Sequence, residues 1–236
     1  MRNKSFVLML CVLLLLFVSG CGGESEVAVP GKEGSAPLNF RTNTAGQLIE
    51  SLNYLSSPLQ GVGLSRWNRR LPTAPRAYRD GIHEGMDYFV RRHTPVLAAG
   101  DGYVVRADHD FVEMTLQEYN EAIAIAKKAE PTPEDIADKF LGRQVWIAHP
   151  DGVLTRYAHL ESVDESIRVG SDVTRGQVIG TVGNSGTRYS IVGGSRFFDG
   201  APHLHFEVWH DGTFLGEGRP FSEIRTIYHN IFHTDN

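Results

Sequence analysis

Residues 202–209 read Pro-His-Leu-His-Phe-Glu-Val-Trp. Side chains alternate between the two faces of an extended strand, so every second residue of this stretch shares a face. The apolar face would carry Leu204, Phe206 and Val208. The opposite face would carry His203, His205, Glu207 and Trp209. The stretch therefore predicts a strand that turns one side to an apolar core and presents two imidazoles on the other. A His-x-His pair alone is a weak functional signal.

Five other short apolar runs are typical of strands and are separated by glycine and other turn residues. They occupy residues 94–99, 102–107, 144–148, 153–158 and 177–182. A parallel α/β fold needs a long crossover, usually a helix, between its strands. Only residues 111–143 offer helical patterns between two of these runs. The sequence thus predicts an all-β core, built as an antiparallel β-sandwich or barrel.

A short helix is expected ahead of the strands. Thr44 and Gln47 have the spacing of a capping box, and apolar residues at helical spacing follow as far as Leu55. We therefore predict a helical lead-in over residues 39–57, with its helix ending at about Leu55, before Pro58.

Residues 111–143 predict a helical hairpin inserted between two strands. Thr115 and Glu118 form one capping-box pattern, and Thr132 and Asp135 form a second. The insertion either buries its own apolar stripe as a surface addition, or forms a wall or lid beside a functional site. The sequence leaves both interpretations open.

Composition limits the class of protein. The 236 residues are 41% hydrophobic and 22% charged, as in ordinary folded proteins, which fits one sizeable domain. The formal net charge is -5, and no run of lysine and arginine forms a basic stripe. Composition therefore disfavours a nucleic-acid partner.

The N-terminal residues have the pattern of a secretory signal peptide. Arg2 and Lys4 precede an apolar run over residues 6–18, and small residues precede Cys21. Residues 18–21 resemble a bacterial lipobox, in which the cysteine is lipidated. A simple secretory signal and an uncleaved anchor are the alternatives.

We expect residues 1–20 to be a lipoprotein signal peptide and Cys21 to be the lipidated residue. Residues 21–38 are rich in Gly, Glu, Ser and Pro, with few large apolar side chains. This composition predicts a flexible tether between the lipid and the folded part of the chain.

Residues 83–87 read His-Glu-Gly-Met-Asp and form a second element with metal-binding residue types. Nearby glycines disfavour a helix, and a turn leading into a strand would aim His83 and Asp87 at one point. Histidine and carboxylate suit zinc, which in catalytic sites usually has three protein ligands and one open position. His83, Asp87 and one histidine of the later His-x-His pair would make such a set.

A third element reads Arg-Tyr-Ala-His-Leu at residues 156–160. His159 would emerge at the end of the strand predicted over 153–158, a place where functional groups are held on a rigid scaffold. Taken alone this histidine carries little weight, because the chain has 10 histidines.

Together, these elements resemble the lysostaphin or LytM-type family of zinc metallopeptidases, whose members cut peptide cross-links in bacterial cell walls. The family patterns His-x-Gly-x-Asp and Tyr-x-His-Leu match residues 83–87 and 157–160. The family strand Pro-His-Leu-His-Phe-Glu matches residues 202–207 without a change. A glycine-rich run at residues 169–186 also matches, with its first interval shorter by two residues. The resemblance covers about residues 58–212.

The resemblance implies a fold, a metal and a reaction. The fold is an antiparallel sandwich or barrel of the duplicated-hybrid-motif type, and we expect this metallopeptidase domain over residues 58–236. The implied zinc ligands are His83, Asp87 and His205. The implied catalytic histidines, which flank the metal, are His159 and His203. One of the two would accept a proton from water and the other would stabilise the oxyanion, and the sequence does not assign which.

The chain departs from the family pattern in two insertions. The helical stretch at 111–143 is unusually long, and residues 187–201 form an extended loop in place of a short serine-glycine link. Both insertions are expected to border the cleft and to affect substrate specificity more than catalysis. Residues 65–70 read Ser-Arg-Trp-Asn-Arg-Arg where the family has Ser-x-Phe-Gly-x-Arg, so no role is transferred to Asn68.

Two functional hypotheses follow. The first is a zinc-dependent endopeptidase that hydrolyses cross-links between peptidoglycan stem peptides and is held at the membrane by lipid on Cys21. The second is a catalytically inactive envelope lipoprotein that binds and activates a cell-wall amidase, as do relatives that have lost ligands. All five metal and catalytic positions are present here, which favours the enzyme.

The sequence also suggests where the protein resides. Gly22, and not aspartate, follows Cys21. In an envelope with two membranes this residue favours the outer membrane, with the protein facing the periplasm. A second envelope protein is a further candidate partner there.

Overall fold

The computed structural model describes residues 37–129, 131–193 and 201–232. Its strands are β1 (Pro75–Arg76), β2 (Gly81–Ile82), β3 (Met86–Phe89), β4 (Pro95–Leu97), β5 (Gly102–Ala107), β6 (Val145–Ala148), β7 (Val153–Ala158), β8 (Leu160–Val163), β9 (Asp172–Val173), β10 (Val178–Val182), β11 (His203–His210) and β12 (Thr213–Phe214). Its α-helices are α1 (Ala45–Ser51), α2 (Leu116–Ala126), α3 (Glu134–Leu141), α4 (Arg188–Val192) and α5 (Phe221–Phe232). Single turns of 3-10 helix lie at Asn68–Arg70 and Pro150–Gly152.

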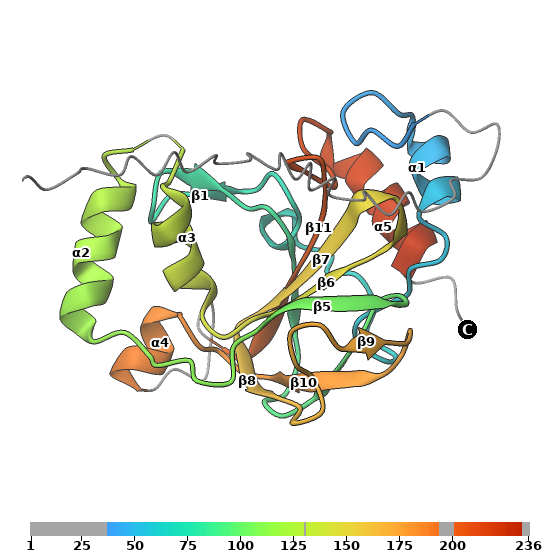
Figure 1. Cartoon of the computed structure of the whole chain (residues 1–236). Coiled ribbons are helices and arrows are strands. Elements are labelled where there is room, and N and C mark those ends of the chain that lie inside the picture. Colours follow the sequence, from blue (N-terminus) through green and yellow to red (C-terminus); the bar gives the residue numbers. More distant parts are fainter. Residues whose placement is uncertain (1–36, 130, 194–200, 233–236) are drawn as a thin grey trace, which may run out of the picture. The chain divides into compact units, whose positions relative to one another are not determined.

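All strand pairings in the described part of the chain are antiparallel. The largest sheet has the order β12-β11-β7-β6-β5-β9, and β3 also pairs with β11. A second sheet has the order β4-β10-β8, and β1 pairs with β2 (Figure 1). The six predicted strands correspond to β4, β5, β6, β7, β10 and β11. The prediction of an antiparallel β core is confirmed, and none of these described sheets closes into a barrel.

Strand β11 has the predicted alternation. Its fully buried core side chains are Leu204, Phe206 and Val208. On its other face, His205 lies opposite Asp87 of β3 on one side and opposite Ala158 of β7 on the other. Because β11 is paired on both edges at this point, the backbone of His205 is held rigidly between two neighbours.

The lead-in forms α1 with the predicted cap. The Thr44 hydroxyl accepts a hydrogen bond from the Gln47 backbone N–H, and the Gln47 side chain accepts one from the Thr44 N–H. The helix ends at Ser51, one turn before the predicted end at Leu55. Beyond it the chain turns toward Ala99, whose carbonyl oxygen accepts a hydrogen bond from the Ser56 N–H. Leu55 is still buried in the main core.

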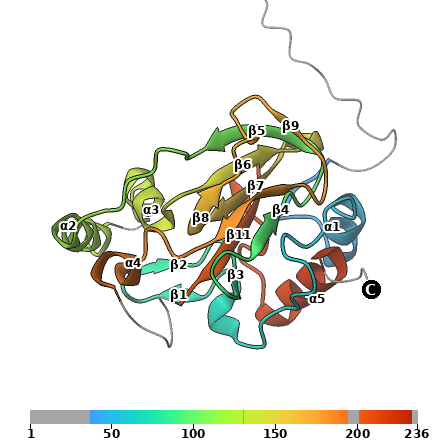
Figure 2. The same cartoon turned by 90° about the horizontal axis from the view of Figure 1, so that it is seen from below.

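Helix α5, which follows Pro220, is not among the predicted elements. Its buried side chains are Ile224, Ile227, Tyr228, Ile231 and Phe232. This face packs into the main core, and the helix lies beside α1 (Figures 1 and 2). The spacing of these apolar residues, three or four apart, is the sequence signal that would have predicted helix α5.

The predicted helical hairpin is present as α2 and α3. The capping box of Thr115 and Glu118 is confirmed. The second predicted box is wrong, because Pro133 occupies the N-cap position of α3 and makes no side-chain cap. The Thr132 hydroxyl instead accepts a hydrogen bond from the Arg79 side chain. The two helices bury an apolar cluster of their own, made by Ala122, Ala126, Ile136 and Phe140.

Helix α4 forms within residues 187–201, which were expected to be a loop, and it lies next to α2. In both views α2, α3 and α4 gather at one end of the large sheet (Figures 1 and 2). The ends of the two insertions cross closely at Gly142 and Gly186, both with positive φ. A Cβ atom on Gly142 would lie 2.4 Å from the Ser185 backbone, so only glycine fits this crossing.

The predicted signal peptide over residues 1–20, the lipidation at Cys21 and most of the tether lie outside the described residues. Within the described part, none of the helices has both the length and the apolar character needed to cross a membrane.

Candidate metal centre

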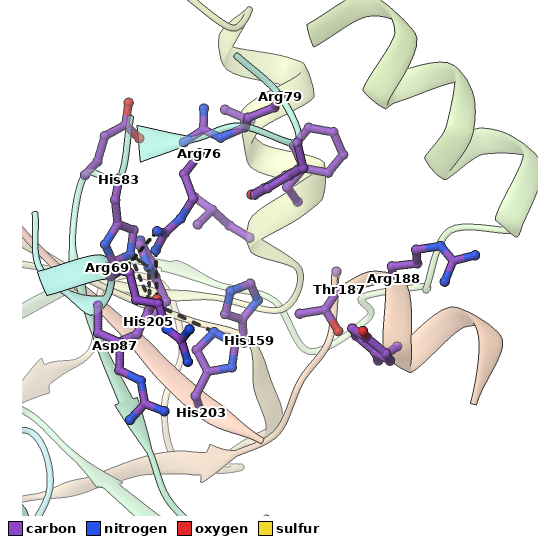
Figure 3. A pocket seen from close by; sticks show the side chains of 18 of the residues that line it. Arg69, Arg76, Arg79, His83, Asp87, His159, Thr187, Arg188, His203 and His205 are labelled. Carbon is purple, nitrogen blue, oxygen red and sulfur yellow. Dashed lines mark hydrogen bonds and ion pairs between the residues drawn. The ribbon is translucent and has the colours of Figure 1, made fainter. Parts of the chain in front are cut away.

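Three side chains of metal-binding type converge at one point. His83 follows β2, Asp87 lies in β3 and His205 lies in β11. The His83 Nε2 atom is 2.9 Å from Asp87 Oδ1 and 3.0 Å from His205 Nδ1, and His205 Nδ1 is 2.9 Å from Asp87 Oδ1. Figure 3 shows the three side chains meeting below Arg76. The structure thus brings together the three residues that the family resemblance implies as ligands.

Hydrogen bonds fix which nitrogen of each histidine faces this point. The His83 Nδ1 atom donates to the Leu71 carbonyl oxygen at 2.8 Å. The His205 Nε2 atom donates to Glu207 Oε1 at 2.7 Å. The remaining nitrogen of each ring therefore faces the Asp87 carboxylate. Metal-binding histidines in proteins are usually held in this way by a carbonyl or carboxylate on the far side of the ring.

The donor set fits a zinc ion. Tetrahedral ligands at about 2.0–2.1 Å from zinc lie about 3.3–3.4 Å from one another, slightly more than the observed separations. Burial lowers the pKa of His205, but its bonds to Asp87 and Glu207 outweigh burial and raise that pKa to about 9. The ligand atoms of His83, Asp87 and His205 form a triangle that therefore attracts a cation. A divalent metal can replace the proton that bridges His205 and Asp87.

Arg76 fixes the second oxygen of Asp87. Its Nη2 atom donates to Asp87 Oδ2 at 2.8 Å, while its Nη1 atom donates to the Arg69 carbonyl oxygen. Burial raises the pKa of Asp87, but the charges of His83 and Arg76 hold it well below its usual range. No role was predicted for Arg76, and no local sequence pattern marks it, because its contact with Asp87 depends on how β1 is placed relative to β3.

Two further histidines flank the triangle. His159 joins β7 to β8 with a positive φ of 59°, and its Nδ1 atom donates to the Ser185 carbonyl oxygen at 2.8 Å. His203 begins β11, and its Nδ1 atom donates to the Ala201 carbonyl oxygen at 2.9 Å. The two ring centroids are 4.5 Å apart. The expectation that His159 lies at a strand end, beside the later pair, agrees with the structure (Figure 3).

Burial keeps these two histidines neutral. It lowers the pKa of His159 well below the ordinary value, and the neighbouring histidines add to this effect. Burial also lowers the pKa of His203, whose Nε2 atom lies 4.0 Å from Asp87 Oδ1. Each ring therefore presents an unprotonated Nε2 atom that can accept a proton.

Glu207 supports His205 from behind. Its carboxylate is fully buried, accepts a 2.5 Å bond from the Trp209 Nε1 atom and lies 3.6 Å from the Arg156 guanidinium. The Arg156 side chain stacks on the rings of Trp146 and Trp209. Burial raises the pKa of Glu207, but the bond and charge of His205 lower it, so the carboxylate stays ionised. The alternation of β11 places Glu207 beside His205, although no role was predicted for it.

The five residues open into a cavity of about 480 Å³. Both insertions contribute to its wall, as expected. The insertion residues that line it are Tyr119, Ala137, Phe140, Leu141, Thr187, Arg188 and Tyr189. Phe140 contacts Tyr78 and Tyr119 edge-on, so one wall is aromatic. The helical hairpin therefore both buries its own apolar cluster and borders the site.

Comparisons with known proteins agree with this arrangement. The family model described as Peptidase family M23 matches residues 81–216, more than half of the chain. A peptidoglycan DD-endopeptidase of Vibrio cholerae is 30% identical over 130 residues, which are 55% of this chain and 21% of that protein. A glycyl-glycine endopeptidase of Staphylococcus capitis is 27% identical over 164 residues, 69% of this chain and 32% of that protein.

Solved structures are also similar. One is a zinc containing peptidase from Vibrio cholerae, with 23% identity and a TM-score of 0.43, covering 71% of this chain and 41% of that one. Another is the catalytic domain of lysostaphin from Staphylococcus simulans, with 21% identity and a TM-score of 0.37, covering 78% of this chain and 99% of that one. The chain spans a third or less of the length of the two curated relatives.

Proposed function

The chain belongs to peptidase family M23, and from that premise we propose that it is a zinc-dependent endopeptidase that hydrolyses peptide cross-links of bacterial peptidoglycan. The observation that carries the proposal is the triangle of His83, Asp87 and His205, with His159 and His203 held at its edge by hydrogen bonds to backbone carbonyls. The presence of all five residues favours this enzyme over an inactive amidase activator.

His83, Asp87 and His205 would hold the zinc ion. A bound zinc ion supplies Lewis acidity, which polarises a scissile carbonyl and lowers the pKa of water to about 7. The protein supplies the proton acceptor and the geometry. Of His159 and His203, one accepts the proton of the attacking water through Nε2, and the other stabilises the developing oxyanion when its own Nε2 atom is protonated. The bonds from their Nδ1 atoms to backbone carbonyls keep both rings oriented for these roles.

Purified peptidoglycan is the test substrate. The full chain, solubilised in mild detergent, should carry about one zinc per molecule and convert cross-linked muropeptide dimers to monomers, as measured by mass spectrometry. Chelation should stop the reaction and added zinc should restore it. Bound zinc without cleavage of any cross-link, together with stimulation of a separate amidase, would instead support the activator.

Glu207 offers a prediction for metal affinity. Glu207→Gln keeps the volume of the side chain but removes the charge that His205 and Arg156 face. We expect zinc affinity to fall about 10- to 100-fold, because the partner of a ligating histidine sets its orientation and basicity. Competition with a chromophoric chelator measures the affinity. Glu217→Gln, at a partly exposed ion pair with Arg41, is the control and should leave affinity unchanged.

We also propose that lipid on Cys21 tethers the enzyme to the envelope, in the outer membrane of a cell with two membranes. The signal-like N-terminal sequence supports this proposal. Mass spectrometry of the N-terminal peptide and membrane fractionation test it. A chain that is unmodified at Cys21, or that is found only in the medium, would reject it.

A further inference from the structure

Arg79 is a buried cation in the wall of the candidate site. It lies in the turn that joins β1 to β2, and it is 9% exposed. Its Nη2 atom donates to the Ile82 carbonyl oxygen at 2.6 Å, and its Nη1 atom donates to the Thr132 hydroxyl at 3.2 Å. Both acceptors are neutral, so neither compensates the guanidinium charge.

Three other arginines that are mostly buried have acidic partners. Arg76 pairs with Asp87, Arg156 with Glu207 and Arg219 with Glu223. Among the described residues, no carboxylate oxygen lies within 4.0 Å of the Arg79 guanidinium. Burial raises the pKa of Glu84 and the charge of Arg79 opposes this rise, but the two side chains form no ion pair. Burial of a charge without an ion-pair partner is unfavourable, so burying the Arg79 guanidinium lowers the stability of the fold.

The cavity around Arg79 is positively charged. Its basic lining residues are Arg69, Arg70, Arg76, Arg79 and Arg188. Its acidic lining residues are Glu84, Asp87 and Glu207. Asp87 is a candidate metal ligand, and Glu207 is bonded to His205. A divalent metal would add to this excess, whereas the whole chain has a formal net charge of -5. Such a cavity attracts anions locally on an otherwise acidic protein.

The described residues leave some N–H donors of the Arg79 guanidinium available for an anion. Of the five N–H groups of arginine, two are used by Ile82 and Thr132. Figure 3 shows Arg79 in the part of the pocket where Arg76 and His83 also lie. Guanidinium groups bind carboxylates with strong, charge-assisted hydrogen bonds of defined geometry.

We propose that Arg79 binds a free carboxylate of the peptide substrate beside the scissile amide, and that the enzyme therefore selects peptides that carry such a carboxylate. This inference rests on the proposed function and adds a specificity-determining residue to it. The insertion acquires a role as well, because Thr132 precedes α3 and holds the guanidinium in position.

The test compares two forms of one cross-linked peptide dimer, one with its free carboxylates and one with the same groups amidated. We expect the wild type to show kcat/KM about 10- to 100-fold higher on the free form, the value of one or two charge-assisted bonds. Arg79→Gln should lose this preference by slowing on the free form alone. Arg79→Lys should retain part of the preference, because it retains the charge.

Two variants separate charge from structure. Thr132→Val removes one hydrogen-bond partner that positions Arg79 but leaves its charge, so the preference should decrease without being lost. Arg168→Gln removes an exposed charge that does not line the cavity, and both rates should stay unchanged. If Arg79→Gln slows both dimers equally, Arg79 is structural and the inference is wrong.

A binding measurement distinguishes this inference from the proposed function. Isothermal titration of chelator-treated protein with each dimer requires no hydrolysis. If the wild type cleaves neither dimer, the proposed function fails. The inference then still stands if the wild type binds the free form more tightly and Arg79→Gln binds both alike. Equal binding of both dimers by the wild type overturns the inference.

Discussion

His205→Ala should lower zinc affinity by about 10²- to 10³-fold and abolish hydrolysis under zinc-limited conditions. Zinc sites bind with about 10–16 kcal/mol, so each of three or four ligands contributes about 3–4 kcal/mol. In this chain the loss extends beyond the ligand. Removing the imidazole leaves Glu207 buried with one bonding partner fewer, and leaves Asp87 with His83 and Arg76 alone.

Zinc content after dialysis against a weak chelator measures this prediction, together with hydrolysis of cross-linked muropeptides. His229→Ala is the matched control, because His229 is exposed on α5 and does not line the cavity. It should leave both quantities unchanged. Retention of zinc affinity within about threefold in His205→Ala would show that His205 does not ligate the metal.

The period-two pattern of β11 makes this part of the site predictable from sequence. Leu204 and Phe206 must enter the core, so His203 and His205 must face the other side, whatever the rest of the fold does. The turn before β3 is likewise local, and it aims His83 and Asp87 together. The family-like motifs then indicate which of these side chains meet.

Contacts between distant segments are less accessible to sequence reasoning. The pairing of Arg76 with Asp87, and the support of Glu207 by Arg156, depend on how strands pack and on which arginine fills a given gap. Thr132 illustrates the same limit. Its spacing to Asp135 fits a capping box, but the hydroxyl bonds to Arg79 from another part of the chain. A local sequence pattern fails to predict a hydrogen bond where a residue from another part of the chain bonds to the same atom.

Substitution of His159 or His203 should have a different effect from substitution of a metal ligand. His159→Ala and His203→Ala should each slow hydrolysis by about 10²- to 10⁴-fold, the usual contribution of a positioned acid or base. Zinc should stay bound in both variants, because neither ring belongs to the triangle of His83, Asp87 and His205. This separation of activity from metal content is what distinguishes a proton acceptor from a ligand.

Zinc analysis and initial rates on the same protein preparation check the separation. The double variant adds a stricter comparison. If His159 and His203 act on one reacting water and its oxyanion, removing both should cost less than the product of the single effects, because groups that act as a unit are not additive. Multiplicative losses would mean that the two rings, 4.5 Å apart, serve separate steps. Loss of zinc from either single variant would contradict the roles proposed for these histidines and assign that residue to the metal.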